Sequence, residues 1–341
     1  MIKKNTIAFR LNVSSEIGYG HLKRLQTLSS FFSSFVFVIP KSSLDILIRS
    51  GVPKEKILTF SDNLGGWWNS ISGLTHIVTD IMNSGNKIFA EIEISKLAVE
   101  PYKLIVIDSI SPDSFMPNNL ISRPDIIIRP YYKSQENLIN DHAIKTLEGA
   151  KYAILDEKFL KARQLLKKSR KPHILLTCGA SDTYGLSLKI LKKLSPAPCP
   201  IDIVVGPLFS SSLSKDLIDF AQSKKEISIY QNISNMIPFY KTASLVIGRP
   251  GLTRYEAAVL GCHGIYLWDT TGYEEYFNEI TKSGLADIYS SSKNGDELRF
   301  FNQLERLAMR IDVVPEKRND IAMKIVDGKG AKRVVNEILR L

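Results

Sequence analysis

Cysteine is scarce in this chain, and histidine is only slightly more frequent. The 341 residues include three cysteines, Cys178, Cys199 and Cys262, and no two of them form a CxxC pair. This spacing excludes a disulfide framework and a cysteine-based metal knuckle. The five histidines form neither an HxxxH nor an HxH pattern. We therefore expect neither a metal site nor a bound cofactor.

Long hydrophobic runs are also missing. No stretch approaches the roughly 20 uninterrupted apolar residues that cross a bilayer. The opening segment, MIKKNTIAFRL, passes from lysines directly into a strand-like run, without the apolar core or cleavage site of a secretory signal. We expect a cytoplasmic protein without stable membrane insertion.

Acidic residues are outnumbered by basic ones. There are 45 Lys and Arg residues against 35 Asp and Glu residues, which gives a formal net charge of +10. An excess of positive charge favours anionic partners such as a nucleotide sugar, a nucleic acid or a membrane surface. No basic run is interleaved with aromatic residues as an RNA-binding module requires, so we expect no nucleic-acid partner.

The apolar residues that are present recur in short runs, separated by segments with helical periodicity. The expected strands are 6–11, 35–40, 76–81, 103–108 and 125–130 in the first half, and 173–177, 201–205, 227–230, 244–248 and 264–268 in the second. Several runs are almost wholly apolar, as in strands covered on both faces. This alternation predicts an α/β fold with two Rossmann-like parallel-sheet domains.

The boundary between the two expected domains lies in the basic segment 161–172, KARQLLKKSRKP. We place the domains at 1–165 and 166–341; the first part of the segment also finishes a solvated helix. The segment 330–341, GAKRVVNEILRL, has the apolar spacing of a helix that packs on either domain. Two such domains would face each other across a cleft, with ligands beyond the carboxyl ends of the strands.

The first strand-to-helix loop combines glycines with a histidine. It reads NVSSEIGYGH at 12–21, and a helix follows. Gly18 and Gly20 allow close backbone approach to a ligand. His21 falls at the helix start, whose positive end disfavours imidazolium, so a neutral imidazole there can act as a general base. The alternative is a glycine loop with His21 packed on a helix end.

Two loops of the second half resemble phosphate-binding turns. The segment 178–182, CGASD, suits either a phosphate-contacting turn or a plain helix cap. The segment 249–256, RPGLTRYE, places glycine before a helix that begins near Thr253 and would favour a diphosphate. Glu256 lies one turn inside that helix. It binds both hydroxyls of a ribose or only complements the helix dipole.

Four segments together carry a resemblance to a known family. The segment FRLNVSSEIGYGHLKRLQTLS resembles the motif RxDxSxxIGxGHxxR of the pseudaminic-acid-pathway UDP-sugar hydrolases, which act on UDP-2,4-diacetamido-2,4,6-trideoxy-beta-L-altropyranose and belong to the MurG-like GT-B superfamily. The turn CGASD resembles their GG-x-D turn. The segments NMIPFYKTASLVIGRPGLTRYEAAVLG and DGKGAKRVV resemble their nucleotide-binding block and closing motif. The matching residues are Arg10, Ser14, Ile17, Gly18, Gly20, His21, Arg24, Gly179, Asp182, Asn235, Met236, Gly251, Thr253 and Glu256.

The departures from the family concentrate in the sugar pocket. Asn12 replaces an Asp, and Asp108-Ser109-Ile110 stands where the family reads Asp-His-Tyr. The segment WDTTGYEEYFNE, at 268–279, replaces an Asn-Gln pair. From this region we select Tyr273 and Glu274 as sugar contacts, with Glu275 and Asn278 as alternatives.

The resemblance implies a GT-B fold and a reaction on a UDP-linked deoxy N-acetylated amino sugar in nonulosonic acid biosynthesis. His21 would activate water, and the helix start at 251–254, with Arg249 or Arg254, would stabilise the departing diphosphate. The implied substrate contacts are Arg10, Asn12, Ser14, Gly18, Gly20, Asp108, Tyr273 and Glu274. The implied nucleotide contacts are Gly179, Ser181, Asp182, Asn235, Met236, Gly251, Leu252, Thr253 and Glu256.

Two alternatives to the hydrolase stay open. The first is a GT-B glycosyltransferase for surface polysaccharide, with an acceptor hydroxyl in place of water and a peripheral contact with a membrane. The second is a non-catalytic nucleotide-sugar-binding protein, against which His21 argues. The pair Trp67-Trp68 and the lone His263 are interpreted as packing residues rather than as parts of a site.

Overall fold

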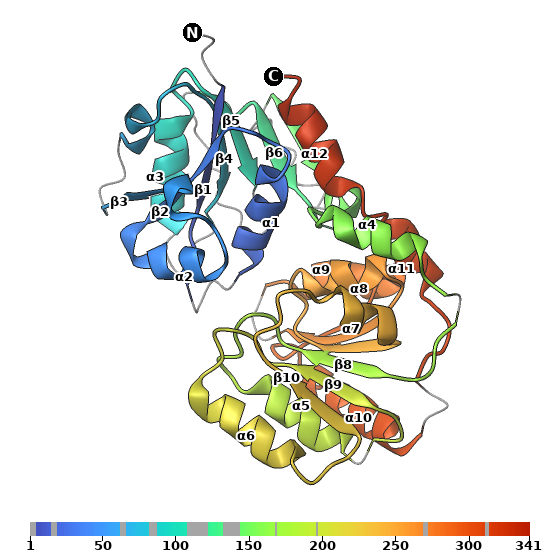
Figure 1. Ribbon diagram of the computed structural model, residues 1–341. Helices are drawn as coiled ribbons and strands as arrows, with labels where there is room; N and C mark the ends of the chain where they lie inside the picture. The colour runs from blue at the N-terminus through green and yellow to red at the C-terminus, as the bar shows by residue number, and fades with distance from the viewer. Residues whose placement is uncertain are drawn as a thin grey trace. The chain divides into compact units, whose positions relative to one another are not determined.

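The chain forms two compact units in a computed structural model (Figure 1). The first unit comprises Met1–Ile154 and Lys329–Leu341, and the second comprises Leu155–Gly328. The structure describes residues 5–14, 19–61, 66–81, 87–107, 122–131, 144–167, 169–195, 197–268, 272–310 and 314–341. Among these residues, no helix is long and apolar enough to cross a membrane.

The first unit is built on a seven-stranded sheet in the order β3-β2-β1-β4-β5-β6-β7, and all neighbouring strands are parallel. Its strands are β1 (Thr6–Leu11), β2 (Phe35–Pro40), β3 (Ile57–Phe60), β4 (Leu74–Asp80), β5 (Lys103–Ile107), β6 (Ile126–Arg129) and β7 (Lys145–Glu148). Its helices are α1 (Gly20–Ser29), α2 (Leu44–Arg49), α3 (Lys87–Leu97) and α12 (Gly330–Ile338), with 3₁₀ turns η1 (Lys41–Ser43), η2 (Lys54–Lys56), η3 (Trp67–Ser70) and η5 (Ala150–Tyr152).

Alternating side chains of β1 show why this sheet is covered on both faces. Phe9 and Leu11 join the core that contains Leu22 and Leu25 of α1 and the apolar face of α12. Ala8 joins the opposite core, which contains the apolar side of α3. Because successive strand residues point to opposite faces, an apolar run needs helices on both sides.

The second unit is built on a six-stranded sheet in the order β10-β9-β8-β11-β12-β13, again parallel throughout. Its strands are β8 (Ile174–Thr177), β9 (Ile201–Val204), β10 (Ile227–Tyr230), β11 (Leu245–Gly248), β12 (His263–Trp268) and β13 (Asp287–Ser290). Its helices are α4 (Glu157–Gln164), α5 (Leu186–Leu194), α6 (Ser211–Ala221), α7 (Ile237–Thr242), α8 (Thr253–Val259), α9 (Glu274–Ser283), α10 (Asp296–Met309) and α11 (Asp320–Ile325). In Figure 1, α5, α6 and α10 cover one face of the sheet, and α7, α8 and α9 cover the other.

The units divide at 154/155 rather than at 165/166 as expected from the basic segment. Helix α4 packs within the second unit, where the Phe159 ring lies 6.1 Å from the Tyr240 ring and Arg163 donates to the carbonyl of Met323 at 2.7 Å. Lys161 and Arg163 therefore lie on α4, and Lys167, Arg170 and Lys171 follow it. Helix α12 belongs to the first unit, where Val334 and Ile338 are buried in the core that includes α1.

Candidate functional site

The carboxyl ends of β1 and β4 meet at one edge of the first sheet. Leu11, the last residue of β1, pairs with Asp80, the last residue of β4. Helix α1 begins at Gly20, after the loop that follows β1. This connection brings His21 and Arg24, in the first half of α1, to the carboxylate of Asp80, which lies 59 positions after His21 in the sequence.

His21, Arg24 and Asp80 form a buried cluster of charged and polar side chains. His21 is 4% exposed, Asp80 1% and Arg24 7%. His21 Nδ1 contacts Asp80 Oδ1. Arg24 donates from Nε to Asp80 Oδ2 at 2.7 Å and from Nη2 to Asp80 Oδ1 at 2.9 Å. The guanidinium thus binds the carboxylate through a bidentate pair of hydrogen bonds, which fixes the orientation of the carboxylate.

The carboxylate selects the tautomer of His21. Arg24 Nη2 lies 3.1 Å from His21 Nδ1, but a guanidinium only donates, and Nδ1 cannot accept from it while donating to Asp80. We assign the proton to Nδ1, because the carboxylate is the stronger acceptor. In the neutral ring, Nε2 then carries a lone pair and can accept a proton.

Asp80 stays ionised in this environment. Burial alone would raise its pKa, but the charge of Arg24 and the contacts from His21 and Arg24 hold the pKa of that carboxyl well below its usual range. A permanent negative charge beside the ring favours the imidazolium that forms when Nε2 takes up a proton.

Sequence reasoning did not select Asp80. The available signal was an acid at the end of the apolar run HIVTDI, which is predicted to end at the same sheet edge as the histidine loop. The acid predicted from the sequence is instead Asp108, which lies outside the described residues, as do Ile17 and Gly18 of the loop.

Of the other residues predicted here, Arg10 on β1 forms a second buried ion pair and contacts Asn12 in the loop. Arg10 donates from Nε to Glu93 at 2.7 Å and from Nη2 at 2.8 Å. Its Nη1 donates to the side-chain oxygen of Asn12 at 2.8 Å, and Trp67 Nε1 donates to Glu93 at 3.3 Å. Arg10 therefore orients Asn12 from within the core. Ser14 is half-buried at the end of the described part of this loop.

Gly20 and the pair Trp67-Trp68 are the remaining residues of the first unit that the sequence analysis considered. Gly20 is the first residue of α1, directly before His21. Trp67 and Trp68 are both buried, with their rings edge to face at 5.4 Å. This position agrees with packing rather than with an exposed stacking surface for a sugar.

In the second unit, the loop after β8 is shaped by glycine and by a helix cap. Gly179 has a φ of +83°, which L side chains rarely adopt. Asp182 is buried and accepts from the backbone N–H groups of Leu186 at 2.9 Å and Ser187 at 2.8 Å. The Ser187 hydroxyl donates to it at 2.6 Å. Asp182 therefore caps α5, while half-buried Ser181 precedes it in the same loop.

The position of the loop after β11 is fixed at the last residue of the strand, Gly248. Gly248 has a φ of +149°, and a Cβ built there would lie 1.9 Å from the carbonyl oxygen of Thr177 at the end of β8. Only glycine permits this approach of the two strand ends. Residues 249–252 then lead into α8, whose first residue, Thr253, is buried. Gly251 and Leu252 thus lie in the turn, as the sequence predicts.

Glu256 lies on the first turn of α8 and is tied to the preceding helix. Tyr240 Oη donates to Glu256 Oε2 at 2.7 Å. Burial, followed by the negative charge of Glu256, raises the pKa of Tyr240 well above its ordinary value, so the phenol stays a donor. Glu256 itself remains half-buried, with its carboxylate oriented by a fixed hydrogen bond.

The remaining predicted residues have mainly local contacts. Asn235 accepts from the backbone N–H of Ile237 at 3.1 Å, and Met236 precedes α7. Tyr273 is buried before α9, with its ring 5.7 Å from that of Trp268. Glu274 accepts from Ser292, a contact that lowers the pKa of Glu274.

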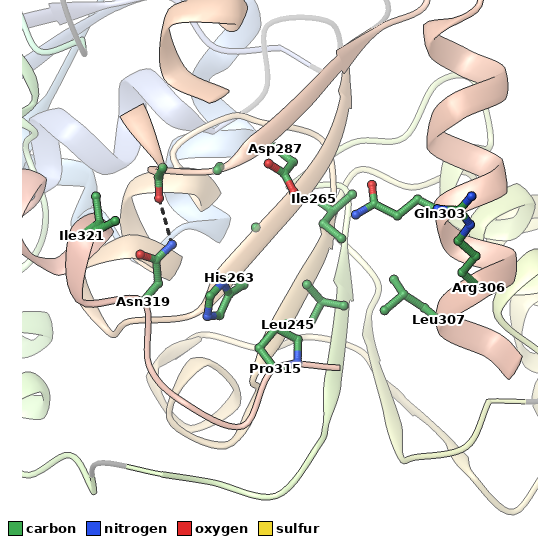
Figure 2. A pocket seen from close by; sticks show the side chains of 13 residues that line it. Leu245, His263, Ile265, Asp287, Gln303, Arg306, Leu307, Pro315, Asn319 and Ile321 are labelled. Atoms are coloured by element: carbon green, nitrogen blue, oxygen red, sulfur yellow. Dashed lines mark hydrogen bonds between the residues drawn. The ribbon is translucent and has the colours of Figure 1, made fainter. Parts of the chain in front are cut away.

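A pocket of about 530 Å³ lies at the opposite edge of the second sheet, where β11, β12 and β13 begin (Figure 2). Its polar groups are largely engaged with the protein. His263 Nε2 lies 3.2 Å from the carbonyl oxygen of Lys317, Asn319 donates to Gly284 at 2.9 Å, and Gln303 accepts from Tyr289 at 2.5 Å. His263 thus has a local structural role. In the described part of the chain, no cluster of His, Cys, Asp and Glu has a geometry that could hold a metal ion.

Comparison with known proteins gives one sequence relative and several structures of the same fold. No known protein-family model matches the chain. The uncharacterized protein MJ1062 of Methanocaldococcus jannaschii is 26% identical over 298 residues, covering 83% of this chain and 60% of that protein. The chain thus spans 60% of the length of this curated relative.

Two solved structures illustrate the fold. MurG of Acinetobacter baumannii has a TM-score of 0.60 and 12% identity, covering 98% of this chain and 100% of its own. UDP-GlcNAc 2-epimerase of Methanocaldococcus jannaschii, in complex with UDP-GlcNAc and UDP, has a TM-score of 0.54 and 14% identity, covering 98% of this chain and 100% of its own. At these identities the likeness shows the fold alone. Together with the two parallel sheets, it confirms the GT-B architecture expected from the sequence.

Proposed function

We propose that this protein hydrolyses a UDP-linked deoxy N-acetylated amino sugar and releases UDP, as a step in nonulosonic acid biosynthesis. The observation that carries this proposal is the buried cluster of His21, Asp80 and Arg24 at the carboxyl edge of the first sheet. A histidine whose Nδ1 proton is held by an ionised carboxylate is equipped to accept a proton at Nε2.

The chemistry follows from that arrangement. A water oxygen attacks the anomeric carbon of the sugar, and its proton passes to His21 Nε2. The bond between the anomeric carbon and the diphosphate oxygen breaks, and its electron pair leaves with UDP. Asp80 stabilises the imidazolium that results, and Arg24 keeps Asp80 ionised and oriented.

The UDP site is assigned to the loops at the carboxyl edge of the second sheet. Support comes from the glycine turn after β11, the oriented carboxylate of Glu256 and the left-handed backbone of the Gly179 turn. Glu256 accepts hydrogen bonds from the ribose hydroxyls. Further support is the shared fold with an epimerase whose crystals hold UDP-GlcNAc and UDP.

Incubation with a panel of UDP-sugars in ¹⁸O-water, with and without acceptors, tests the proposal. We expect UDP release without an acceptor, with the label on the anomeric carbon of the sugar and none on UDP. Label on UDP would mean attack at phosphorus and would contradict the proposed chemistry. Release of UDP only after an acceptor is added would instead identify a glycosyltransferase.

A further inference from the structure

Arg10 is enclosed in the first unit, and its donors are directed to protein oxygens. It is 2% exposed. Its Nε and Nη2 donate to the two carboxylate oxygens of Glu93, at 2.7 and 2.8 Å, and its guanidinium carbon lies 4.7 Å from the centroid of the Phe60 ring. These contacts fix the plane of the guanidinium. The resemblance implies a substrate contact for Arg10, but this burial favours a supporting role.

The Nη1 group of Arg10 binds the chain at the point where β1 ends. It donates to the carbonyl oxygen of Leu11 at 2.5 Å and to Oδ1 of Asn12 at 2.8 Å. Leu11 is the last residue of β1 and pairs with Asp80, so Asn12 begins the loop that leads to His21. The ion pair of Arg10 and Glu93 is therefore connected to the end of the sheet that carries the candidate proton acceptor.

The contact with Arg10 determines which way the side-chain amide of Asn12 is turned. A guanidinium only donates hydrogen bonds, so the atom that it contacts is the amide oxygen, and Nδ2 lies on the other side of the amide. Asn12 is half-buried. Within the described part of the chain, its Nδ2 has no hydrogen-bond partner. Asn12 therefore presents a donor, which an acceptor on a ligand would satisfy.

The polarity of this position distinguishes between two forms of an amino sugar. The carbonyl oxygen of an acetamido group only accepts hydrogen bonds, whereas a free ammonium group only donates them. The Nδ2 group of Asn12 matches the acetylated form and repels the free amine. An aspartate in place of Asn12, as in the family that the sequence resembles, would have the opposite polarity.

We propose that Asn12 determines specificity for the sugar by donating from Nδ2 to the carbonyl oxygen of an acetamido group, and that Arg10 and Glu93 are positioning residues that set the direction of this amide. The inference rests on the proposed function. It adds the polarity of one contact and a role for Glu93, a residue that neither the sequence motifs nor the resemblance indicates.

Isothermal titration with three ligands tests the contact with Asn12. The ligands are UDP, UDP-2,4-diacetamido-2,4,6-trideoxy-beta-L-altropyranose and the same nucleotide sugar with free amino groups. All titrations use the His21→Asn background, in which we expect slow turnover. We expect the parent protein to bind the acetylated sugar about 10-fold or more tightly than the amino sugar, as for one hydrogen bond. Asn12→Asp keeps the shape and the contact with Arg10 but removes the donor, so it should abolish or reverse this preference without changing UDP affinity.

Glu93→Gln tests the positioning role. We expect the preference for the acetylated sugar to fall by a few-fold, because the amide no longer holds the guanidinium of Arg10 through two acceptors. Added to Asn12→Asp, it should have no further effect on the preference, because the two carboxylate oxygens are equivalent. Glu148→Gln is the matched control: it removes the same charge from an ion pair with another buried arginine, Arg129, and should leave the preference unchanged.

Melting temperatures identify the folded variants, and Asn12→Asp alone decides the contact if Glu93→Gln does not fold. A folded Asn12→Asp variant with the parent preference would overturn the role of Asn12. The same result in a folded Glu93→Gln variant would leave Glu93 with a purely structural role. Equal affinity of the parent protein for the two sugars, with UDP binding intact, would overturn the acetamido contact. Failure to bind UDP at all would instead overturn the UDP site of the proposed function.

Discussion

The sites at the carboxyl ends of the two parallel sheets differ in how they are built. At the carboxyl ends of the strands in the first sheet, charged side chains from distant parts of the sequence are buried against each other. Examples are the pairs Asp80–Arg24 and Arg10–Glu93. At the carboxyl ends of the strands in the second sheet, glycines and helix caps shape the backbone, as with Gly248 and with Asp182 at the start of α5. A buried charge cluster suits proton transfer, because its groups are oriented and shielded from water. A backbone turn suits the binding of phosphates and ribose.

Substitution of His21 should have the largest effect on this contrast. We expect His21→Asn to reduce turnover by about 10²-fold or more, because a positioned base contributes about 10²–10⁴. UDP affinity should stay nearly unchanged, since UDP is assigned to the other unit. Steady-state kinetics and UDP titration measure the two quantities. A folded variant with near-normal turnover would return His21 to a packing role.

Asp80→Asn should affect both turnover and stability. We expect a loss of turnover no larger than that of His21→Asn, because the amide keeps the ring in place but neither holds the Nδ1 tautomer nor stabilises the imidazolium. The free energy of unfolding should fall by about 3 kcal/mol or more, because Arg24 is left buried without its anion. Adding Arg24→Met should recover part of that stability, which a double-mutant cycle by urea unfolding would detect. Strict additivity would contradict the coupling.

The same pair predicts a pH dependence of stability. The pKa of Asp80 is lowered on folding, so its contribution is fully present above its unfolded value of about 3.9 and is lost as the pH falls below that value. Unfolding free energy measured between pH 5 and pH 2 should therefore fall less steeply in Asp80→Asn than in the wild type. Equal slopes would mean that Asp80 does not carry this linkage.

Glu256→Ala should have a smaller effect, confined to nucleotide binding. We expect UDP affinity to fall by about 10-fold through loss of charged hydrogen bonds to the ribose, so the increase in melting temperature with UDP should shrink. Glu297→Ala offers a matched control, because it removes an exposed first-turn acid from α10. Identical UDP shifts in all three proteins would remove Glu256 from the ribose.

The smallest effect is expected for Asp182. Because the structure uses it to cap α5, Asp182→Ala should cost about 1 kcal/mol of unfolding free energy with little change in UDP affinity. Thermal unfolding and UDP titration of the same samples separate the two roles. A large loss of affinity at unchanged stability would favour the phosphate contact that the sequence also suggests.

The fold was predictable because central parallel strands are apolar on both faces and stand out as short hydrophobic runs. The strands not predicted, β3, β7 and β13, each lie at an edge of a sheet. Such strands are only partly covered; in β7 only Leu147 is buried. Their sequences therefore resemble loops, and the hydrophobic pattern does not reveal them.

The candidate site was predictable only where it is local. His21 was selected from glycines within its own loop, but its partner Asp80 arrives through the pairing of β1 with β4. Arg10 similarly meets Glu93 across 83 residues of chain. Strand pairing brings Asp80 to His21, and the packing of α3 on the sheet brings Glu93 to Arg10. One sequence does not reveal which acid ends beside which base.

The return of α12 to the first unit sets an order for biosynthesis. Gly330 sits so close to Ala153 that a Cβ would lie 2.1 Å from its carbonyl oxygen, and Val334 and Ile338 fill the core beside α1. A ribosome translates all of Leu155–Gly328 before it reaches this helix. The core of the first unit therefore cannot be completed until the whole second unit has been synthesised, so the second unit can finish folding before the first.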